Sequence, residues 1–255
     1  CFQGTSMDSA TFKDETNNQI PNFTRAVVDS SGQTSLFFDT DTTGNDIVSF
    51  QLLFNDPQNG WVVVDTITPN SPVPYSWPGS QADGRSEEVK IVSMDSCGNS
   101  SDDLLSQTHK TVYLRNRLNK CEGTSRLSWN PYEGFPSGVD GYRLLVQITE
   151  PDSTRLPLTP LFDGGPDDTT FLQQRVERGY TYCYVVEAYD TTSGLTSRSN
   201  IECVEAEVLQ KSKQLYIAQV DNDHDRDAID MEVYIDGKSD VRSFQFERAP
   251  EYYGP

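Results

Sequence analysis

The stretch Asp46-Ile47-Val48-Ser49-Phe50-Gln51-Leu52 decides the fold, because the chain repeats it. It returns as Asp240-Val241-Arg242-Ser243-Phe244-Gln245-Phe246, and a divergent middle copy reads Val139-Asp140-Gly141-Tyr142-Arg143-Leu144. The aromatic anchors of the three copies, Phe50, Tyr142 and Phe244, are 92 and 102 residues apart. A period of about 100 residues is the length of one small β-domain. The sequence therefore predicts three related units.

Runs of alternating polar and apolar residues surround these copies. Residues 34–38, 126–129 and 230–235 precede them, and residues 180–188 form a longer run of the same kind. Period-two alternation is typical of half-buried strands, and the run 180–188 would face Tyr182, Tyr184, Val186 and Ala188 inward. Turn-forming residues separate the runs, and no stretch keeps a helical period. We therefore expect an all-β protein of tandem immunoglobulin-like sandwiches.

The repeat also predicts how the chain divides. Residues 1–20 form a polar lead-in, residues 21–109 a first domain, residues 110–207 a second, and residues 208–255 a partial third. Three strands cannot close a two-sheet core, so the last unit is expected to be incomplete. Both ends look cut from a longer protein, without a signal peptide, and Phe2-Gln3-Gly4 also resembles the scar of a cleaved tag.

The composition excludes several classes of partner. The 255 residues carry a formal net charge of −19, which repels the phosphate backbone of nucleic acids. No apolar run approaches the length of about 18 residues that a membrane helix needs, so no membrane insertion is expected. Hydrophobic residues make up only 35% of the chain, which suits thin sandwiches with one face in water.

The middle unit contains Leu127-Ser128-Trp129-Asn130-Pro131 and, further along, Tyr142. These residues resemble the tryptophan on the second strand and the tyrosine on the third strand of fibronectin type III domains. Residues 182–188 resemble that family's sixth strand, with Tyr182 in the place of the tyrosine corner. The first unit matches less well, because Ser86-Glu87-Glu88 stands where the corner tyrosine is expected. The resemblance implies tandem fibronectin type III-like β-sandwiches.

A second pattern consists of Met94-Asp95-Ser96-Cys97-Gly98-Asn99-Ser100, residues 108–114, Cys121 and residues 199–203. It resembles repeat regions of large Bacteroidetes surface proteins, which are associated with gliding motility and type IX secretion. The resemblance implies a secreted, bacterial cell-surface protein that serves as a spacer or adhesin. The implied partners are other domains of the same long chain and a surface polysaccharide or protein.

Five cysteines, none in a C-x-x-C pair, predict disulfides rather than a zinc site. In the sandwich that the resemblance implies, Cys97 lies within reach of Cys1, and Cys121 and Cys183 lie at the same pole. We therefore favour the pairs Cys1–Cys97 and Cys121–Cys183, with Cys203 open. The alternative pairs Cys183 with Cys203 across the last two strands, because Cys183 should point outward.

No cofactor is expected, apart from Ca²⁺ at two acidic loops. Their closely spaced carboxylates suit a cation that takes six to eight oxygen ligands, although capping of turns explains the same residues. Neither loop matches an EF-hand. The candidate ligands are Asp39, Asp41 and Asp46 in the first loop, and Asp221, Asp223 and Asp225 in the second.

The remaining candidate sites are weaker. Trp61, Tyr75 and Trp77 cluster in the first unit and could bind a glycan, although core packing explains them as well. His109 lies at the expected domain junction, where we expect it to pack between domains. No nucleophile elbow, phosphate loop or zinc-binding helix motif is present, so the chain is not expected to be an enzyme.

We therefore predict an extracellular structural or adhesive segment of a large bacterial surface or secreted protein, acting as a stiff multi-domain spacer. Two alternatives remain open. One is a carbohydrate- or protein-binding module, and the other is an accessory region of a secreted hydrolase.

Overall fold

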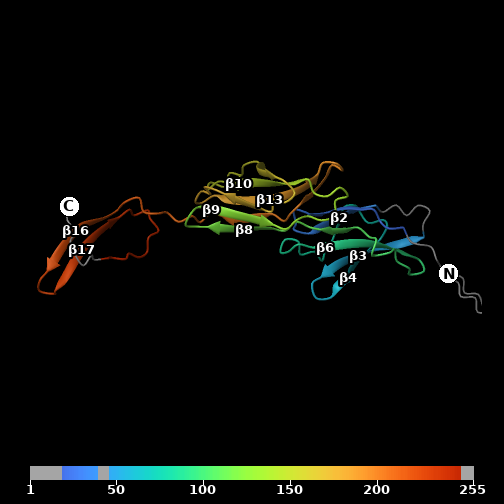
Figure 1. The fold of residues 1–255 in the computed structure, drawn as a ribbon, viewed down its shortest axis with the longest axis horizontal. Helices are drawn as coiled ribbons and strands as arrows, with labels where there is room; N and C mark the ends of the chain where they lie inside the picture. The colour runs from blue at the N-terminus through green and yellow to red at the C-terminus, as the bar shows by residue number, and fades with distance from the viewer. Residues whose placement is uncertain (1–18, 40–45, 248–255) are drawn as a thin grey trace, which may run out of the picture.

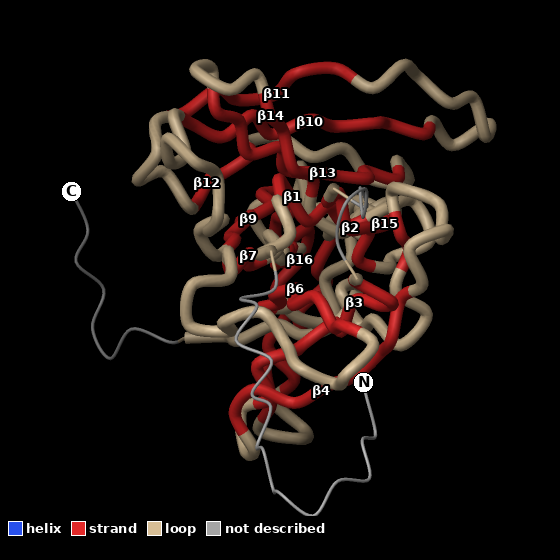
Figure 2. Tube along the Cα trace, turned by 90° about the vertical axis from the view of Figure 1, so that its right-hand side faces the viewer, coloured by secondary structure: helices blue, strands red, loops and turns tan. Residues whose placement is uncertain are grey.

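The computed structural model describes residues 19–39 and 46–247, which form two β-sandwiches and a β-hairpin (Figure 1). The described residues contain strands and loops but no helix (Figure 2). No segment of this described part therefore forms a helix that could cross a membrane. The predicted all-β fold class is confirmed.

The first sandwich packs a three-stranded sheet on a four-stranded one, and all its pairings are antiparallel. The smaller sheet has the order β1-β2-β5, with β1 (Phe23–Val28), β2 (Thr34–Phe38) and β5 (Tyr75–Ser76). The larger has the order β4-β3-β6-β7, with β3 (Ile47–Asp56), β4 (Gly60–Ile67), β6 (Glu88–Asp95) and β7 (Thr108–Lys110).

The second sandwich repeats this order of strands. The smaller sheet has the order β12-β9-β8, with β8 (Leu114–Asn119), β9 (Thr124–Trp129) and β12 (Thr170–Gln173). The larger has the order β11-β10-β13-β14, with β10 (Gly141–Thr149), β11 (Thr159–Gly164), β13 (Thr181–Asp190) and β14 (Leu195–Arg198). The strand β15 (Glu202–Glu205) also pairs with β13. First, second and fifth strands thus form one sheet, and the others form the second, as the fibronectin type III resemblance implies.

The two cores are built from equivalent residues. Phe50 on β3 and Tyr142 on β10 are 2% and 0% exposed, and each lies on the third strand of its sandwich. The predicted inward residues of β13, which are Tyr182, Tyr184, Val186 and Ala188, are all buried. The expectation that these two copies of the repeat fold alike is confirmed.

The corner of each sandwich is closed by a different chemical group. In the second, the Tyr182 hydroxyl accepts a hydrogen bond from the Glu177 backbone N–H at 3.0 Å, as in a tyrosine corner. In the first, the buried carboxylate of Glu87 accepts from the Gln81 backbone N–H at 2.7 Å and from the Thr34 and Ser80 hydroxyls. A carboxylate therefore holds the upstream backbone where the family pattern has a phenol.

The third unit consists of a hairpin alone. The strands β16 (Leu215–Asp223) and β17 (Ala228–Ile235) pair with each other and with no other described strand. The expected third strand at residues 240–246 does not form, and Phe244 is 44% exposed. The prediction that Phe244 shares the environment of Phe50 and Tyr142 is therefore wrong. A third strand needs a neighbouring strand to pair with, and none is described beside it.

Cys183 and Cys203 form a disulfide between β13 and β15, where the two residues are directly opposite in register. The favoured pair Cys121–Cys183 is wrong, and the alternative pair is confirmed. The physical reason is register, because opposite residues on adjacent strands point to the same face of the sheet. The Cys121 thiol is free and exposed. Cys1 lies outside the described residues, so its pairing with Cys97 stays a prediction.

We expect that replacing both Cys183 and Cys203 by Ala lowers the free energy of unfolding by about 3 kcal/mol, because the bridge closes a loop with a sequence separation of 20. Urea unfolding measures the difference. Cys121→Ala is the matched control and should leave the unfolding midpoint unchanged. Equal midpoints for the double variant and the wild type would contradict the pairing.

Candidate functional site: a buried joint between two sandwiches

The three aromatic candidates for glycan binding do not form one exposed surface. Trp77 is 4% exposed and packs against Phe54 in the first core, so its ring is not available to a ligand. Tyr75 is half-buried, and its hydroxyl donates to the Asp65 carboxylate, which raises its pKa to about 12 through burial and that hydrogen bond. Trp61 is partly exposed like Tyr75, and the Lys90 ammonium lies 4.3 Å from the centre of its ring.

Among the described residues, the acidic candidates for Ca²⁺ do not form a group that could hold a metal ion. Asp41 lies outside the described residues, while Asp39 and Asp46 flank that gap. At the hairpin turn, the Asp223 carboxylate accepts from Arg226 and from the Asp225 backbone N–H. Across residues 19–39 and 46–247, no three carboxylate, histidine or cysteine side chains are placed to hold a metal ion. Ca²⁺ binding stays a prediction.

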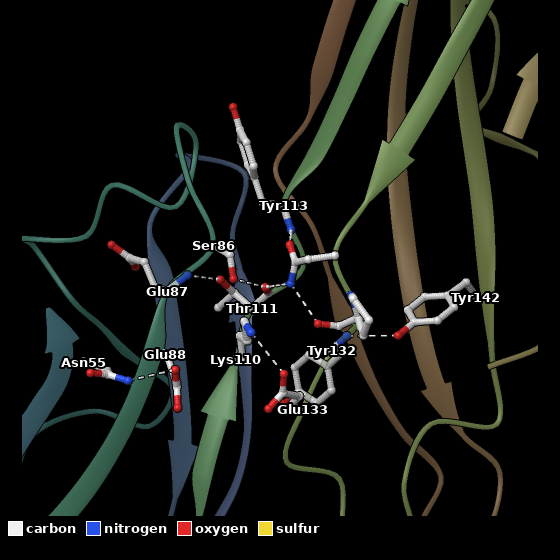
Figure 3. Close-up of polar contacts among 12 residues, drawn as sticks. Asn55, Ser86, Glu87, Glu88, Lys110, Thr111, Tyr113, Tyr132, Glu133 and Tyr142 are labelled. Carbon is white, nitrogen blue, oxygen red and sulfur yellow. Dashed lines mark hydrogen bonds and ion pairs between the residues drawn. The ribbon is translucent and has the colours of Figure 1, made fainter. Parts of the chain in front are cut away.

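The linker between the sandwiches is hydrogen-bonded on both sides (Figure 3). The backbone N–H of Thr111 donates to the Glu87 carbonyl, and its hydroxyl accepts from the Glu87 N–H, at 2.9 Å each. The carbonyl of Thr111 accepts from the Ser86 hydroxyl and the Asn130 amide. The Asn130 amide oxygen also accepts from the Tyr113 N–H at 2.8 Å. The linker is thus part of both sandwiches.

His109 lies at the centre of the joint and is fully buried. Its Nε2 is 2.9 Å from the Phe23 carbonyl in the first sandwich, and its Nδ1 is 2.8 Å from the Tyr132 hydroxyl in the second. A carbonyl only accepts, so Nε2 carries the proton and Nδ1 accepts from Tyr132. The Tyr132 oxygen in turn accepts from the Ala26 N–H at 3.1 Å. Both ring nitrogens of His109 and the Tyr132 hydroxyl are therefore hydrogen-bonded across the two domains.

Aromatic rings continue the contact from one sandwich to the other. The ring centres of Phe23 and His109 are 4.2 Å apart, those of His109 and Tyr132 are 6.0 Å apart, and those of Tyr132 and Phe135 are 4.2 Å apart. Phe23 belongs to the core of the first sandwich, and Tyr132 and Phe135 to that of the second. Offset ring pairs at these distances add attraction beyond the burial of their area.

Polar contacts surround the aromatic centre. Lys110 and Glu133 exchange backbone hydrogen bonds, and their side chains form an ion pair at 3.1 Å. On the other side β1 lies along β14: the Ser197 hydroxyl donates to the Ala26 carbonyl at 2.6 Å, and Arg25 donates to the Thr196 carbonyl. The joint therefore fixes both translation and rotation of one sandwich relative to the other.

A cleft with a volume of about 190 Å³ opens beside this contact. Val28, Asp29 and Ser30 line it from the first sandwich, while Leu158, Ile201 and the disulfide residue Cys183 line it from the second. Ile201 and Leu158 are 54% and 42% exposed. The carboxylate of Asp29 is already engaged by the hydroxyls of Ser31, Ser35 and Ser76, so it serves the fold.

No protein-family model and no curated protein sequence matches the chain. Similar solved structures include a two-domain fibronectin type III segment of chicken tenascin, with 15% identity over 73% of this chain and 98% of that one, and a TM-score of 0.28. The FN1–FN3 domains of chicken CNTN1 share 14% identity over 74% and 67%, with a TM-score of 0.27. The chicken interferon gamma receptor alpha chain shares 12% over 73% and 98%, with a TM-score of 0.26.

The chain is a tandem of fibronectin type III-like sandwiches. The strand order and antiparallel pairing of both domains identify this fold. Sequence reasoning placed His109 between the domains, but it missed Tyr132 and Asn130, which complete the joint. The signal available was that both residues directly follow the tryptophan strand, near the end of the sandwich that faces the linker.

Gly134 supplies the sharpest test of the joint. Its φ is +119°, and a Cβ there would lie 2.4 Å from His109 Nδ1 and 2.6 Å from the Thr108 carbonyl. We expect Gly134→Ala to separate the sandwiches and to cost about 3 kcal/mol or more, from the clash and the backbone strain together. Gly138, with a φ of +87° and open space around it, is the matched control. Its Ala variant should lose only the roughly 1 kcal/mol of backbone strain. Urea unfolding compares the two variants, and equal losses would refute the close packing.

The joint should also weaken as the pH falls. Burial lowers the pKa of His109 to about 4, whereas the unfolded histidine has a pKa of about 6.5. The unfolded chain therefore binds the extra proton between these values, and stability drops as the pH falls through that window. From pH 7 to pH 5 the loss should be about 2 kcal/mol.

Urea unfolding at both pH values measures this loss. His109→Gln cannot titrate and should remove the pH dependence of the first sandwich. His224→Gln is the control, because His224 is exposed on the hairpin and its replacement should keep the dependence. A slope that survives in His109→Gln would assign the effect to other groups.

Proposed function

We propose that this chain is a stiff structural segment of an extracellular protein, in which the two sandwiches act as one rigid spacer. The observation that carries the proposal is the buried joint around His109, where hydrogen bonds, ring contacts and a bonded linker cross between domains. Two domains joined by a flexible linker would move independently, whereas this linker has its polar groups satisfied within the two folds.

The disulfide and the surface charge support the extracellular part of the proposal. A bond between Cys183 and Cys203 persists in an oxidising compartment. A net charge of −19 keeps an extended chain soluble and separates it from other acidic surfaces. Fibronectin type III-like domains are commonly structural or binding modules, and the proposed spacer has the structural role.

Alignment of the two sandwiches in solution tests the rigid spacer. Residual dipolar couplings of the full chain should fit one common alignment tensor for both domains in the wild type. Gly134→Ala should give two different tensors, while Gly138→Ala should keep one. Two unequal tensors in the wild type would contradict the spacer, because the joint would then be flexible in solution.

The proposal extends to a place on the surface of a gliding, type IX-secreting Bacteroidetes cell. Residues 94–100, 108–114 and 199–203 with Cys121 motivate it, and so does the suitability of a stiff rod for display or adhesion. Brief proteolysis of intact source cells, followed by mass spectrometry of the released peptides, tests it. Release of peptides from this chain supports surface display, and their absence beside released peptides of other surface proteins contradicts it.

A ligand-binding module is the second candidate, and the cleft beside the joint and the partly exposed Trp61 are the observations that favour it. A protein or polysaccharide ligand would then contact one of these two places. The accessory role beside a secreted hydrolase remains a proposal. Ca²⁺ binding at the acidic loops also remains a proposal.

A further inference from the structure

One face of the β16–β17 hairpin is apolar from its base to Val220 and Met231, and Asn222 opposite Ile229 continues it at the tip. The register pairs Leu215 with Ile235, Ile217 with Val233, and Val220 with Met231, and directly opposite residues share a face. Leu215, Ile217, Val220 and Met231 are between 41% and 57% exposed. The opposite face carries the stacked pair Tyr216–Tyr234 and the polar pairs Gln219–Glu232 and Asp221–Asp230. The hairpin stands clear of the second sandwich (Figure 1).

The same face is buried in both complete sandwiches. Ala26 and Leu36, paired on β1 and β2, are 0% exposed, and so is Leu127 on β9. A single two-stranded hairpin is at best marginally stable in water. Contiguous exposed apolar area of this kind marks a site of interaction, since covering it recovers roughly 25 cal/mol for each Å² removed from water.

Charge is distributed unevenly along the hairpin. The tip carries five aspartates against the single Arg226, which pairs with Asp223 and Asp230. The base carries four exposed basic residues, and of its two acidic residues Asp240 is paired with Arg178. The tip aspartates are Asp221, Asp223, Asp225, Asp227 and Asp230. The basic residues of the base are Lys211, Lys213, Lys238 and Arg242.

We propose that the apolar face of the hairpin is covered by the same face of a second copy of this chain, with the two hairpins antiparallel about a two-fold axis. This arrangement is self-complementary, as a two-fold interface must be. It places the acidic tip of each copy against the basic base of the other. A parallel arrangement would instead bring the two acidic tips together, where their charges repel. A second copy therefore matches both the apolar face and the opposite charges of the tip and the base.

The size of the face sets the strength of the dimer. Two strands of about nine residues, at about 3.3 Å per residue and about 4.8 Å between strands, offer on the order of 300 Å² per copy. The total of about 600 Å² is below the roughly 1,200 Å² of a stable complex. The dimer is therefore weak and depends on protein concentration. It joins two copies through their third units.

Sedimentation equilibrium of the full chain tests the proposal, from about 10 μM to about 1 mM at low ionic strength. The wild type should show a monomer–dimer equilibrium that weakens at 0.5 M salt, because the tip-to-base attraction is screened. Ile217→Asp should abolish it. Tyr216→Asp is the matched control, since Tyr216 and Ile217 are both 53% exposed but lie on opposite faces.

A charge reversal tests the orientation without touching the apolar face. Lys213→Glu should raise the dissociation constant about tenfold, because the two-fold axis repeats the change at both ends of the interface. Adding Asp225→Lys to that variant should restore it, since the new pair is again complementary between copies. Both sites are exposed, so misfolding does not explain a loss that the second substitution rescues.

Three outcomes overturn the proposal. A monomer at every concentration means that something other than a second copy covers the face. A dimer that survives Ile217→Asp is formed by another surface. A failure of Asp225→Lys to rescue Lys213→Glu excludes the antiparallel arrangement. None of these results affects the rigid spacer, because its test depends on the joint around His109 and not on the hairpin.

Discussion

A neutral imidazole held between two β-sandwiches is the contact on which the shape of this molecule depends. His109 donates to a carbonyl of the first domain and accepts from a phenol of the second, so one ring satisfies groups on both sides. Its burial removes water from the contact, which strengthens each hydrogen bond and makes an unpaired partner costly. A charged imidazole would need two acceptors there, and Nδ1 already faces a hydroxyl that serves as donor.

A sandwich needs two sheets to bury its apolar residues. This requirement explains why the two complete domains bury theirs and the hairpin does not. Both complete domains bury residues of their first two strands against a second, larger sheet. The hairpin keeps the alternation but has no such sheet beside it, so its apolar face stays in contact with water. The first joint is thus made of buried side chains, while an ion pair between Arg178 and Asp240, beyond the end of β17, links the second sandwich to the third unit.

In the first sandwich, a carboxylate replaces the corner tyrosine of the family pattern, and the strand order stays the same. Glu87 closes the corner of the first sandwich with its carboxylate, and Tyr182 closes that of the second with its phenol. Both side chains supply an oxygen that accepts from an upstream backbone N–H, and this acceptor is what the corner requires. The same principle explains Asn130, whose amide imitates a peptide group and binds the linker on both its donor and acceptor sides.

The amino-acid sequence by itself determined the fold class and the equivalence of Phe50 with Tyr142, because period-two alternation is a local property and the repeat near 100 residues is visible in the sequence. It also placed His109 between domains, since that residue lies at the boundary of two repeats. Tertiary structure alone decided which cysteine lies opposite Cys183, that Trp77 packs into a core, and that Tyr132 reaches His109. These outcomes depend on strand register and on how two domains meet, and both are set by contacts between residues far apart in the chain.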